Sequence, residues 1–256
     1  MILEGRTISK GRAEGTVLKL DEALSFLGGV DASTGELKVG NGGNVKGRIL
    51  VFPRGKGSTV GSFVMYDLKA HGKEPAAVIN QSAETIVATG AVISSIPMVD
   101  SIDVSLIRDG DEIAVDADGG TVEIRNVKMI TAASSVVLID GKIMLLRRPD
   151  TARSFPGCWS LCSGKREEGE DIRDTAAREI MEETGMEVSN IIRSLPPVYV
   201  REKDVIWEVY GFLFDARNQV PVLNKENLEY KLVTVEEMEG MKLVELTLEM
   251  VKKLLD

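Results

Sequence analysis

The sequence is poor in the side chains that most often carry catalysis or hold metals. It contains one histidine, His71, and two cysteines, Cys158 and Cys162, in 256 residues. A Ser-His-Asp triad would have to be built around His71, which removes most histidine-based mechanisms. Two cysteines cannot form a disulfide framework, and without a second pair they do not make a zinc site. These scarcities exclude several common classes of enzyme.

The sequence also lacks long apolar runs and an excess of positive charge. No apolar run reaches the roughly 18 residues needed to cross a bilayer, and the opening MILEGR lacks the core of a signal peptide. The net formal charge is −9, whereas a protein that binds a nucleic-acid backbone is basic. We therefore expect a cytoplasmic protein that binds neither membranes nor nucleic acid.

The length and the apolar content predict two packed domains. A chain of 256 residues with 43% apolar side chains is long enough for two modest cores. We expect one hairpin over residues 110–124, with its turn at a Gly-Gly pair, and a second that starts at residue 134. The interval between them predicts a boundary that separates domains 1–128 and 129–256.

In the first half, a loop rich in glycine and serine follows a short apolar run. The run, Ile49–Phe52, predicts a buried strand. It leads into PRGKGSTVGS, residues 53–62, and then into residues 63–72, whose apolar spacing predicts a helix. A strand, a loop and a helix in this order aim backbone N–H groups at an anion, although a turn without chemistry has the same composition.

The first half resembles a known family along its whole length. The resemblance is carried by GRTISKGRAEGTVLKLDEALSFLGGVD, GRILVFPRGKGSTVGS and KEPAAVINQSAETIVATGAVISSIPMVD. These segments are similar to the swivelling domain of aconitase X, the small subunit of archaeal phosphomevalonate dehydratase. The resemblance implies a swivelling β/β/α domain whose loop closes over a catalytic partner, a lyase of isoprenoid biosynthesis.

The same resemblance implies a catalytic role for Ser62, which aligns with the serine that the family is held to use as a proton-abstracting base. Arg54 and Lys56 are candidates to bind substrate or to lower the pKa of that hydroxyl, and they are explained equally well as solvated loop charges. The family's [4Fe–4S] cluster belongs to the large subunit. This chain has too few cysteines to hold a cluster, so dehydration requires an iron–sulfur partner.

The second half contains three glutamates that would repel one another on a helix. Within GKREEGEDIRDTAAREIMEETGM, residues 164–186, Glu179, Glu182 and Glu183 have the spacing i, i+3, i+4. Each like-charge contact at this spacing costs on the order of 0.2–0.5 kcal/mol. Mg²⁺ or Mn²⁺ would offset that repulsion, whereas an isolated pattern of this kind would be a solvated acidic face.

The residues around these glutamates complete a longer motif. Asp171 is typical of a helix N-cap and Gly185 of a C-cap. The motif consists of Gly164, Glu170, Arg178, Glu179, Glu182, Glu183 and Gly185. It resembles the Nudix box with every specified position filled. The resemblance implies an α/β/α sandwich and metal-dependent attack of water on a diphosphate linked to another group.

The Nudix resemblance also implies a metal-binding set. Glu182 and Glu183 would be the main ligands of Mg²⁺ or Mn²⁺, together with the carbonyl of Gly164. Glu179 would either ligate the metal or act as the catalytic base. Glu229 is a weaker candidate ligand, since it fits the edge of a surface strand equally well.

Two further pairs complete the expected site. Glu170 and Arg178 would pair to hold the loop of the box against its helix. Arg147 and Arg148 would contact phosphate, or would lie at a solvated strand end. In the strand predicted near Trp207, alternation places Trp207 and Val209 on one face and Glu208 and Tyr210 on the other. We expect Trp207 and Tyr210 to pack in the sheet rather than to stack on a base.

Three functions follow from these patterns. The leading hypothesis is a Nudix pyrophosphohydrolase that acts on a nucleotide or an isoprenoid-type diphosphate and is fused to a swivelling domain. The second is a dehydratase small subunit that donates Ser62 to an iron–sulfur large subunit, with the Nudix half as an accessory. The third is a non-catalytic ligand sensor, which would not need the full set of glutamates.

Overall fold

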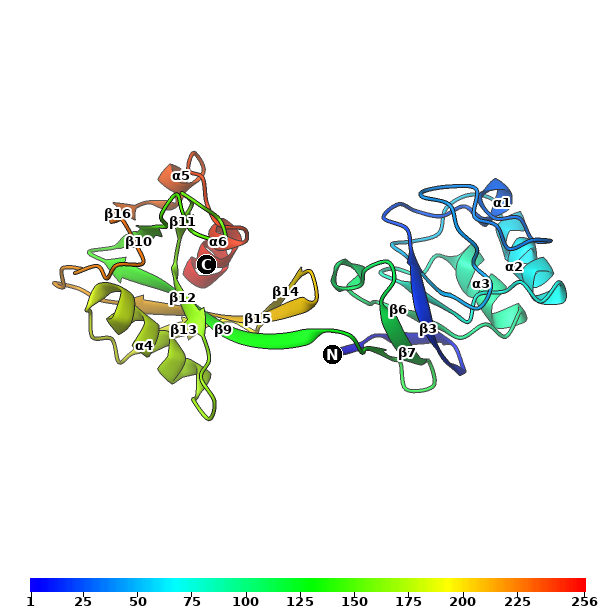
Figure 1. Ribbon diagram of the computed structural model, residues 1–256, viewed down its shortest axis with the longest axis horizontal. Coiled ribbons are helices and arrows are strands. Elements are labelled where there is room, and N and C mark those ends of the chain that lie inside the picture. Colours follow the sequence, from blue (N-terminus) through cyan, green and yellow to red (C-terminus); the bar gives the residue numbers. More distant parts are fainter. The chain divides into compact units, whose positions relative to one another are not determined.

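An eight-stranded sheet lies at the centre of each half of the chain. The structure, a computed structural model, describes residues 1–256, which divide into the units Met1–Lys128 and Met129–Asp256. Each unit has its own sheet, its own helices and its own apolar core (Figure 1). No helix is long and apolar enough to cross a membrane.

The first unit contains a mixed sheet with the strand order β1-β8-β7-β3-β4-β5-β6-β2. Strands β3 to β6 run parallel to one another, and the remaining pairs are antiparallel. Its strands are β1 (Ile2–Glu4), β2 (Arg6–Ser9), β3 (Arg12–Lys19), β4 (Ile49–Phe52), β5 (Ala77–Asn80), β6 (Met98–Asp100), β7 (Glu112–Asp116) and β8 (Thr121–Ile124), and its helices are α1 (Phe26–Gly29), α2 (Val60–Ala70), α3 (Thr85–Ile93) and the 3₁₀ turn η1 (Val104–Leu106).

The predicted strand and the predicted hairpin of the first unit are confirmed. All four residues of β4 are buried, as expected for a parallel strand covered on both faces, and β7 pairs with β8 across the Gly-Gly turn. Helix α2 begins at Val60, three residues before the predicted start, so the end of the expected loop is helical. The sequence concealed this start because Gly61 and Ser62 have the composition of a loop.

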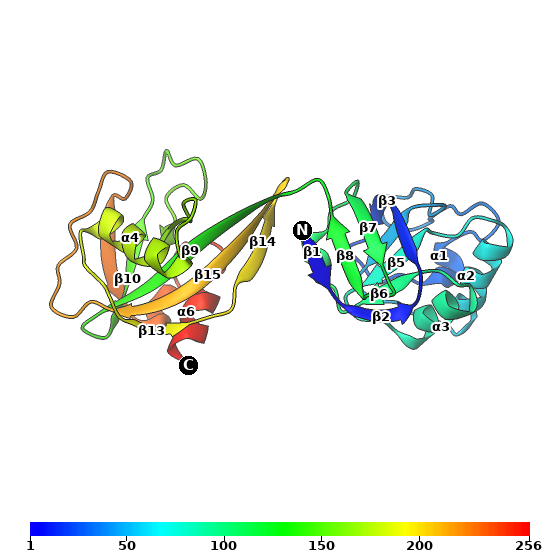
Figure 2. The same ribbon diagram turned by 90° about the horizontal axis from the view of Figure 1, so that it is seen from below.

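Helices α2 and α3 pack against each other and share one core with the parallel strands (Figure 2). Their close approach depends on Gly90 of α3, where a Cβ atom would lie 2.5 Å from Sδ of Met65 on α2. Real Cβ atoms essentially never make so short a contact. The glycine therefore sets the distance between the two helices.

The second unit is built on the strand order β11-β10-β9-β15-β13, in which β12 also pairs with β9, β14 with β15, and β16 with β10. Its strands are β9 (Lys128–Ile139), β10 (Lys142–Arg147), β11 (Trp159–Ser160), β12 (Cys162–Lys165), β13 (Ile191–Ser194), β14 (Val198–Glu202), β15 (Val205–Asp215) and β16 (Glu229–Val233), and its helices are α4 (Ile172–Thr184), α5 (Val235–Met238) and α6 (Thr247–Leu255). The predicted hairpin from residue 134 is formed by β9 and β10.

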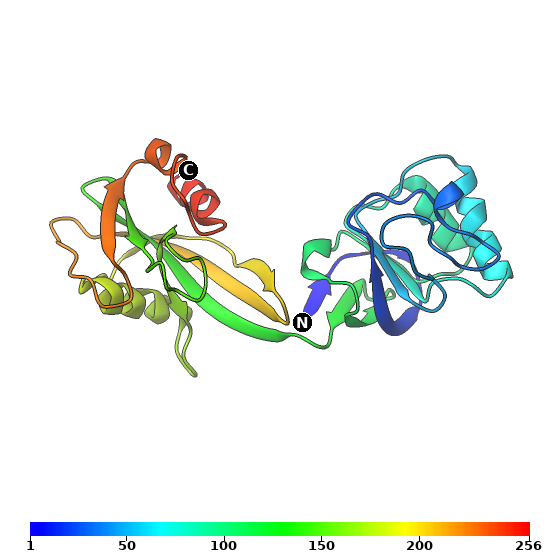
Figure 3. The ribbon, with the colours of Figure 1, turned by 45° about the horizontal axis from the view of Figure 1, so that its top comes forward.

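Helices cover both faces of the second sheet, which gives the expected α/β/α sandwich (Figure 3). Alternate residues of β9 divide between two cores: Val137 packs with Ile180 of α4, and Val136 packs with Val251 of α6. The same alternation separates Tyr210, in the core beneath α4, from Val209, in the core beneath α6. The sheet therefore presents α4 and its glutamates on one face only.

Candidate active site

Helix α4 carries the three glutamates, and its ends are those predicted. The Asp171 carboxylate accepts a hydrogen bond from the Arg173 N–H at 2.8 Å, which caps the first turn. Gly185 ends the helix in the left-handed conformation, at φ 67°, and its N–H donates to the Met181 carbonyl. Both caps are local, so they fix which residues of the segment are helical.

Arg178 is the centre of an ion-pair network between α4 and the preceding loop. Its guanidinium donates to both Glu170 oxygens, at 2.9 and 3.1 Å, and to the Lys165 carbonyl at 3.1 Å. The same side chain reaches Glu179 at 2.6 Å and Glu182 at 3.3 Å. Hydrogen bonds, above all those from Arg178, lower the pKa of Glu170 to about 2. Glu170 and Arg178 thus hold the loop against the helix.

Gly164, on β12, lies directly against the Glu179 carboxylate. A Cβ atom at Gly164 would stand 1.8 Å from Cδ of Glu179, so only glycine leaves room for that side chain. Glu179 is largely buried, and burial raises its pKa, with the charges of Glu182 and Glu226 acting in the same direction. Arg178 opposes these effects. A nearby positive charge would therefore stabilise the ionised form of the Glu179 carboxylate.

Glu183 is the most buried of the three glutamates, with 9% of its surface exposed. Burial, followed by the charge of Glu179, raises its pKa to about 7, although Asn227 and Cys162 lie beside the carboxylate and oppose the shift. Its Oε2 has no hydrogen-bond partner, and neither has Nδ2 of Asn227. A buried acceptor without a donor is costly unless another group satisfies it.

The loop after β15 brings two residues to the site that the sequence analysis missed. Asn227 lies beside Glu183, and the charge of Glu226 acts on Glu179. The loop is tied to the end of α4, where Val222 and Asn224 donate backbone N–H groups to the carbonyls of the last turn, at 2.7 and 3.2 Å. No spacing rule connects residues 222–227 with α4, because the contact depends on the tertiary fold.

Two features of the glutamates on α4 show that their oxygen atoms fit a divalent cation. As they stand, no three acidic, histidine or cysteine side chains are arranged to hold an ion, since Glu179 and Glu182 turn toward Arg178. However, the unpartnered Oε2 of Glu183 and the raised pKa values of Glu179 and Glu183 are features that a cation would relieve. Carboxylate and carbonyl oxygens suit Mg²⁺ or Mn²⁺, so the residues fit such an ion.

Glu229, Arg147 at the end of β10 and Arg148, which follows the strand, make other contacts than those of the α4 glutamates. Glu229 lies opposite Arg147 in the β10–β16 pair and accepts a hydrogen bond from it at 3.3 Å. Arg148 donates to the Ser154 carbonyl at 3.0 Å and to its hydroxyl at 3.2 Å. The structure thus engages Arg147 and Arg148 within the protein, and the charge of Glu226 acts on Glu179. Metal binding by Glu229 and phosphate binding by the two arginines stay predictions.

Ser62 lies in the first turn of α2 rather than in the loop. It is buried, and its hydroxyl donates to the Thr59 carbonyl at 2.8 Å. Arg54 and Lys56 are exposed in the loop after β4, and their side chains form no ion pair. Their backbones pair with Leu24 instead, at 3.1 and 2.9 Å. The structure therefore gives Ser62 a backbone partner and no cationic one.

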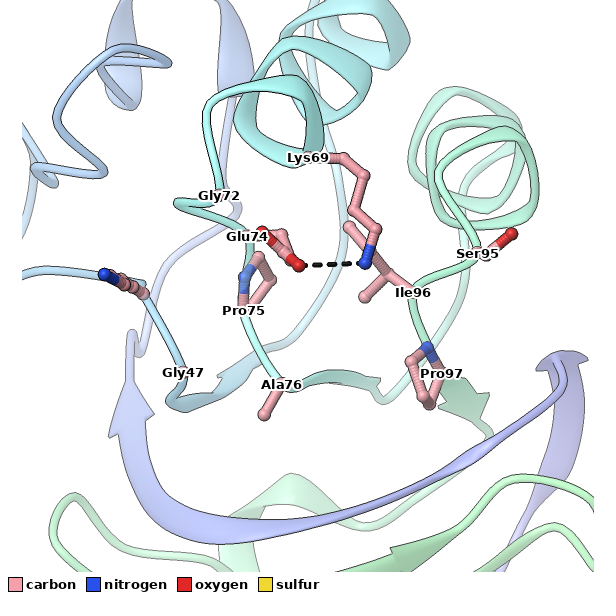
Figure 4. Close-up of a pocket in the computed structure, with 10 residues that line it drawn as sticks. Gly47, Lys69, Gly72, Glu74, Pro75, Ala76, Ser95, Ile96 and Pro97 are labelled. Carbon is pink, nitrogen blue, oxygen red and sulfur yellow. Dashed lines mark hydrogen bonds and ion pairs between the residues drawn. The ribbon is translucent and has the colours of Figure 1, made fainter.

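A pocket of about 250 Å³ in the first unit contains none of the predicted site residues. It is lined by the segments that precede β4, β5 and β6, and an ion pair between Lys69 and Glu74, 2.8 Å long, crosses it (Figure 4). Ligands of parallel sheets bind outside the carboxyl ends of the strands, whereas this pocket lies at the amino ends. The loop with Arg54 and Lys56 follows β4 and so lies at the carboxyl end.

Comparison with known proteins divides the chain at the same place. Residues 2–124 match the aconitase X swivel domain, and residues 129–254 match the NUDIX domain. The phosphomevalonate dehydratase small subunit of Thermococcus kodakarensis is 56% identical over 128 residues, which cover 48% of this chain and 96% of that protein.

Two solved structures are similar to one half each. The crystal structure of aconitase X from Thermococcus kodakaraensis, in its holo-form, has 54% sequence identity and a TM-score of 0.48, and the match covers 49% of this chain and 98% of that one. The MutT protein of Methanosarcina mazei has 26% identity and a TM-score of 0.43, and the match covers 51% of this chain and 95% of that one.

Proposed function

We propose that this chain, which belongs to the aconitase X swivel domain family through residues 2–124 and carries a NUDIX domain over residues 129–254, is a metal-dependent pyrophosphohydrolase. The single observation that carries the proposal is the buried Glu183, whose Oε2 lacks a partner beside the carboxylate of Glu179. A cluster of this kind calls for a cation, and the NUDIX match supplies the class of reaction. The substrate is a nucleotide or another diphosphate joined to a second group.

Different residues of the site would bind the metal and activate the reacting water. Glu182 and Glu183 would hold Mg²⁺ or Mn²⁺ with the Gly164 carbonyl, and Glu179 would either join them or take the proton of the attacking water. When bound, the cation neutralises phosphate oxygens and lowers the pKa of water. Arg178 keeps the loop and the helix in register, so the carboxylates stay where the substrate needs them.

The test is hydrolysis of a panel of nucleotides and isoprenoid diphosphates with Mg²⁺, with Mn²⁺ and with EDTA. Glu182→Gln and Glu183→Gln should each weaken metal binding and lower turnover by about 100-fold or more, as expected when a metal ligand is lost. Glu167→Gln is the matched control, because its side chain is exposed in the same loop. Undiminished hydrolysis by both ligand variants would refute the assignment.

A second function, that of a dehydratase small subunit, is favoured by an exposed apolar row on α2. Val60, Phe63 and Tyr66 follow one another at intervals of three residues and are 46%, 67% and 53% exposed. Ser62 is in the same turn of the helix as Val60 and Phe63, but its own side chain is buried. An apolar row of this kind is typical of a surface that another chain covers. We propose that it binds an iron–sulfur large subunit, which would carry the [4Fe–4S] cluster and use Ser62.

Co-expression with the large subunit of the same genome tests this second function. Size-exclusion chromatography should show a complex that Phe63→Ser weakens, whereas Val92→Ser, at a similarly exposed apolar position on α3, should not. Ser62→Ala should keep the complex and abolish loss of water from phosphomevalonate. Absence of both a complex and dehydration would reject this function and leave the pyrophosphohydrolase proposal intact.

A further inference from the structure

The hairpin β14–β15 carries a polar cluster that the proposed hydrolysis does not use. The Glu208 carboxylate accepts hydrogen bonds from three hydroxyl groups: Tyr199 and Tyr210 donate to Oε1, at 3.2 and 3.4 Å, and Thr131 donates to Oε2 at 2.9 Å. Burial, followed by the charge of Glu208, raises the pKa of both tyrosines, so their hydroxyls remain donors. We call these four residues the Glu208 cluster.

The Glu208 cluster lies on the face of the sheet that bears α4. Tyr199 stands directly opposite Glu208 in the strand pair, and Tyr210 is two residues further along β15, so all three side chains share one face. Tyr210 packs at the edge of the core beneath α4. The hairpin extends past the end of α4 (Figure 2). All four residues of the cluster are half-buried.

Backbone hydrogen bonds connect the cluster with the carboxylates of α4. Gly164, which lies against Glu179, pairs with Ala133 on β9, and Thr131 is two residues along the same strand, about 7 Å away. The Thr131 carbonyl accepts the N–H of Arg166 at 2.9 Å. The side chain of Arg166 is exposed and forms no ion pair, and its charge acts on Tyr210. The positive charge of Arg166 thus lies close to the cluster, just after the strand that carries Gly164.

The Glu208 carboxylate can accept one hydrogen bond more than the three that it receives within the cluster. A carboxylate offers about four lone-pair positions, and the three hydroxyls use three of them. Oε1 is filled by two donors, and Oε2 can accept one more hydrogen bond. It would attract one N–H group and repel a carbonyl oxygen. The rings of the two tyrosines provide aromatic surface against which a flat base can stack.

We propose that the Glu208 cluster binds the base of a nucleotide substrate and selects bases that carry an exocyclic amino group over those with a keto group at the same position. The inference rests on the proposed pyrophosphohydrolase function and narrows its substrate class. In this arrangement Glu208 accepts the amino N–H, Arg166 pairs with a phosphate, and the diphosphate extends toward Glu179 and Glu183.

Two pairs of substrates test the selection with the full-length protein. ATP and ITP differ by an amino or a keto group on the base, as do CTP and UTP in the corresponding ring position. Wild-type protein should favour the amino member of each pair by about 10-fold in kcat/KM, the lower part of the range for base recognition by a carboxylate. Glu208→Gln, which offers the base an N–H donor as well as an acceptor, should reduce the preference to about twofold or reverse it.

The control and the binding experiment separate the two proposals. Glu202→Gln, on the exposed part of the same hairpin, should leave both ratios unchanged. Calorimetry with non-hydrolysable α,β-methylene analogues of ATP and ITP should show the same preference. If nucleotides are cleaved without a base preference, the inference is wrong and the hydrolase remains. If nothing is cleaved but the analogues bind with the preference, the hydrolase is wrong and the inference remains. Should Glu208→Gln fail to fold, the wild-type ratios decide alone.

Discussion

Replacing Gly164 with alanine should damage catalysis far more than stability. The added Cβ would lie 1.8 Å from Cδ of Glu179, and ordinary contact begins at 3.4 Å, so the carboxylate must move by about 1.6 Å. The moving group is the end of a flexible side chain, whereas the backbone of Gly164 is not in the left-handed region. The free energy of unfolding should therefore fall by only about 1 kcal/mol, the low end for overpacking.

The catalytic effect should be larger because position matters more than volume at a metal site. A displacement of about 1 Å in a catalytic group costs on the order of 100-fold in rate. Gly164→Ala should thus reduce kcat/KM by about 100-fold, with thermal unfolding close to that of the wild type. Gly240→Ala is the matched control, since a Cβ there meets nothing within 4 Å and its φ is ordinary. If Gly164→Ala hydrolyses diphosphates at the wild-type rate, the placement of Glu179 does not matter and the reasoning fails.

Three further predictions follow. Burial raises the pKa of Glu183 above its ordinary value to about 7. The contribution of Glu183 to the free energy of unfolding is therefore complete below about pH 4.5 and is lost as the pH rises through 7. Unfolding measured in EDTA should show this loss in the wild type and less of it in Glu183→Gln, and equal losses in both proteins would contradict the prediction. Arg178→Lys cannot keep both bonds to Glu170, so the free energy of unfolding should fall by about 1.5–3 kcal/mol and turnover should drop, as measured by chemical denaturation and kinetics. In Gly90→Ala the added Cβ would overlap Met65, so the first unit should lose about 1–3 kcal/mol of stability, as measured by calorimetry. Diphosphate cleavage should persist in this variant. Loss of cleavage while the second unit stays folded would show that the two units share a site.

The parts of the site that the sequence predicted are those with local causes. The bounds of α4 follow from Asp171 and Gly185, which cap the helix through neighbours in the chain. The contact between Arg178 and Glu170 spans one loop and is encoded by a fixed spacing. Strands β4, β7 and β8 follow from apolar runs and turn residues. The helix caps, the Arg178–Glu170 contact and the β7–β8 hairpin each form within about a dozen residues, and for β4 only the apolar run is local, because its partner strands are distant in the sequence.

The parts that the sequence did not predict depend on contacts between distant segments. Glu226 and Asn227 reach the α4 carboxylates because a loop more than 30 residues away folds over the end of the helix. Arg147 is engaged by Glu229 because of the register between β10 and β16, which no local pattern specifies. The early start of α2, which includes Ser62, is stabilised by burial against the sheet in spite of weak helix formers.

The hydrogen bonds between the loop 222–227 and the last turn of α4 would link the affinity of the proposed site for metal to the position of this loop. The N–H groups of Val222 and Asn224 satisfy carbonyls that would otherwise be left open at the helix end. The same segment carries Glu226 and Asn227 to the carboxylates, so if the proposed cation binds there, its binding would also favour the closed arrangement of the loop. Any entropy lost when the loop becomes ordered would then reduce the free energy of metal binding. A substitution that only loosens this loop would lower the affinity for metal without altering any ligand.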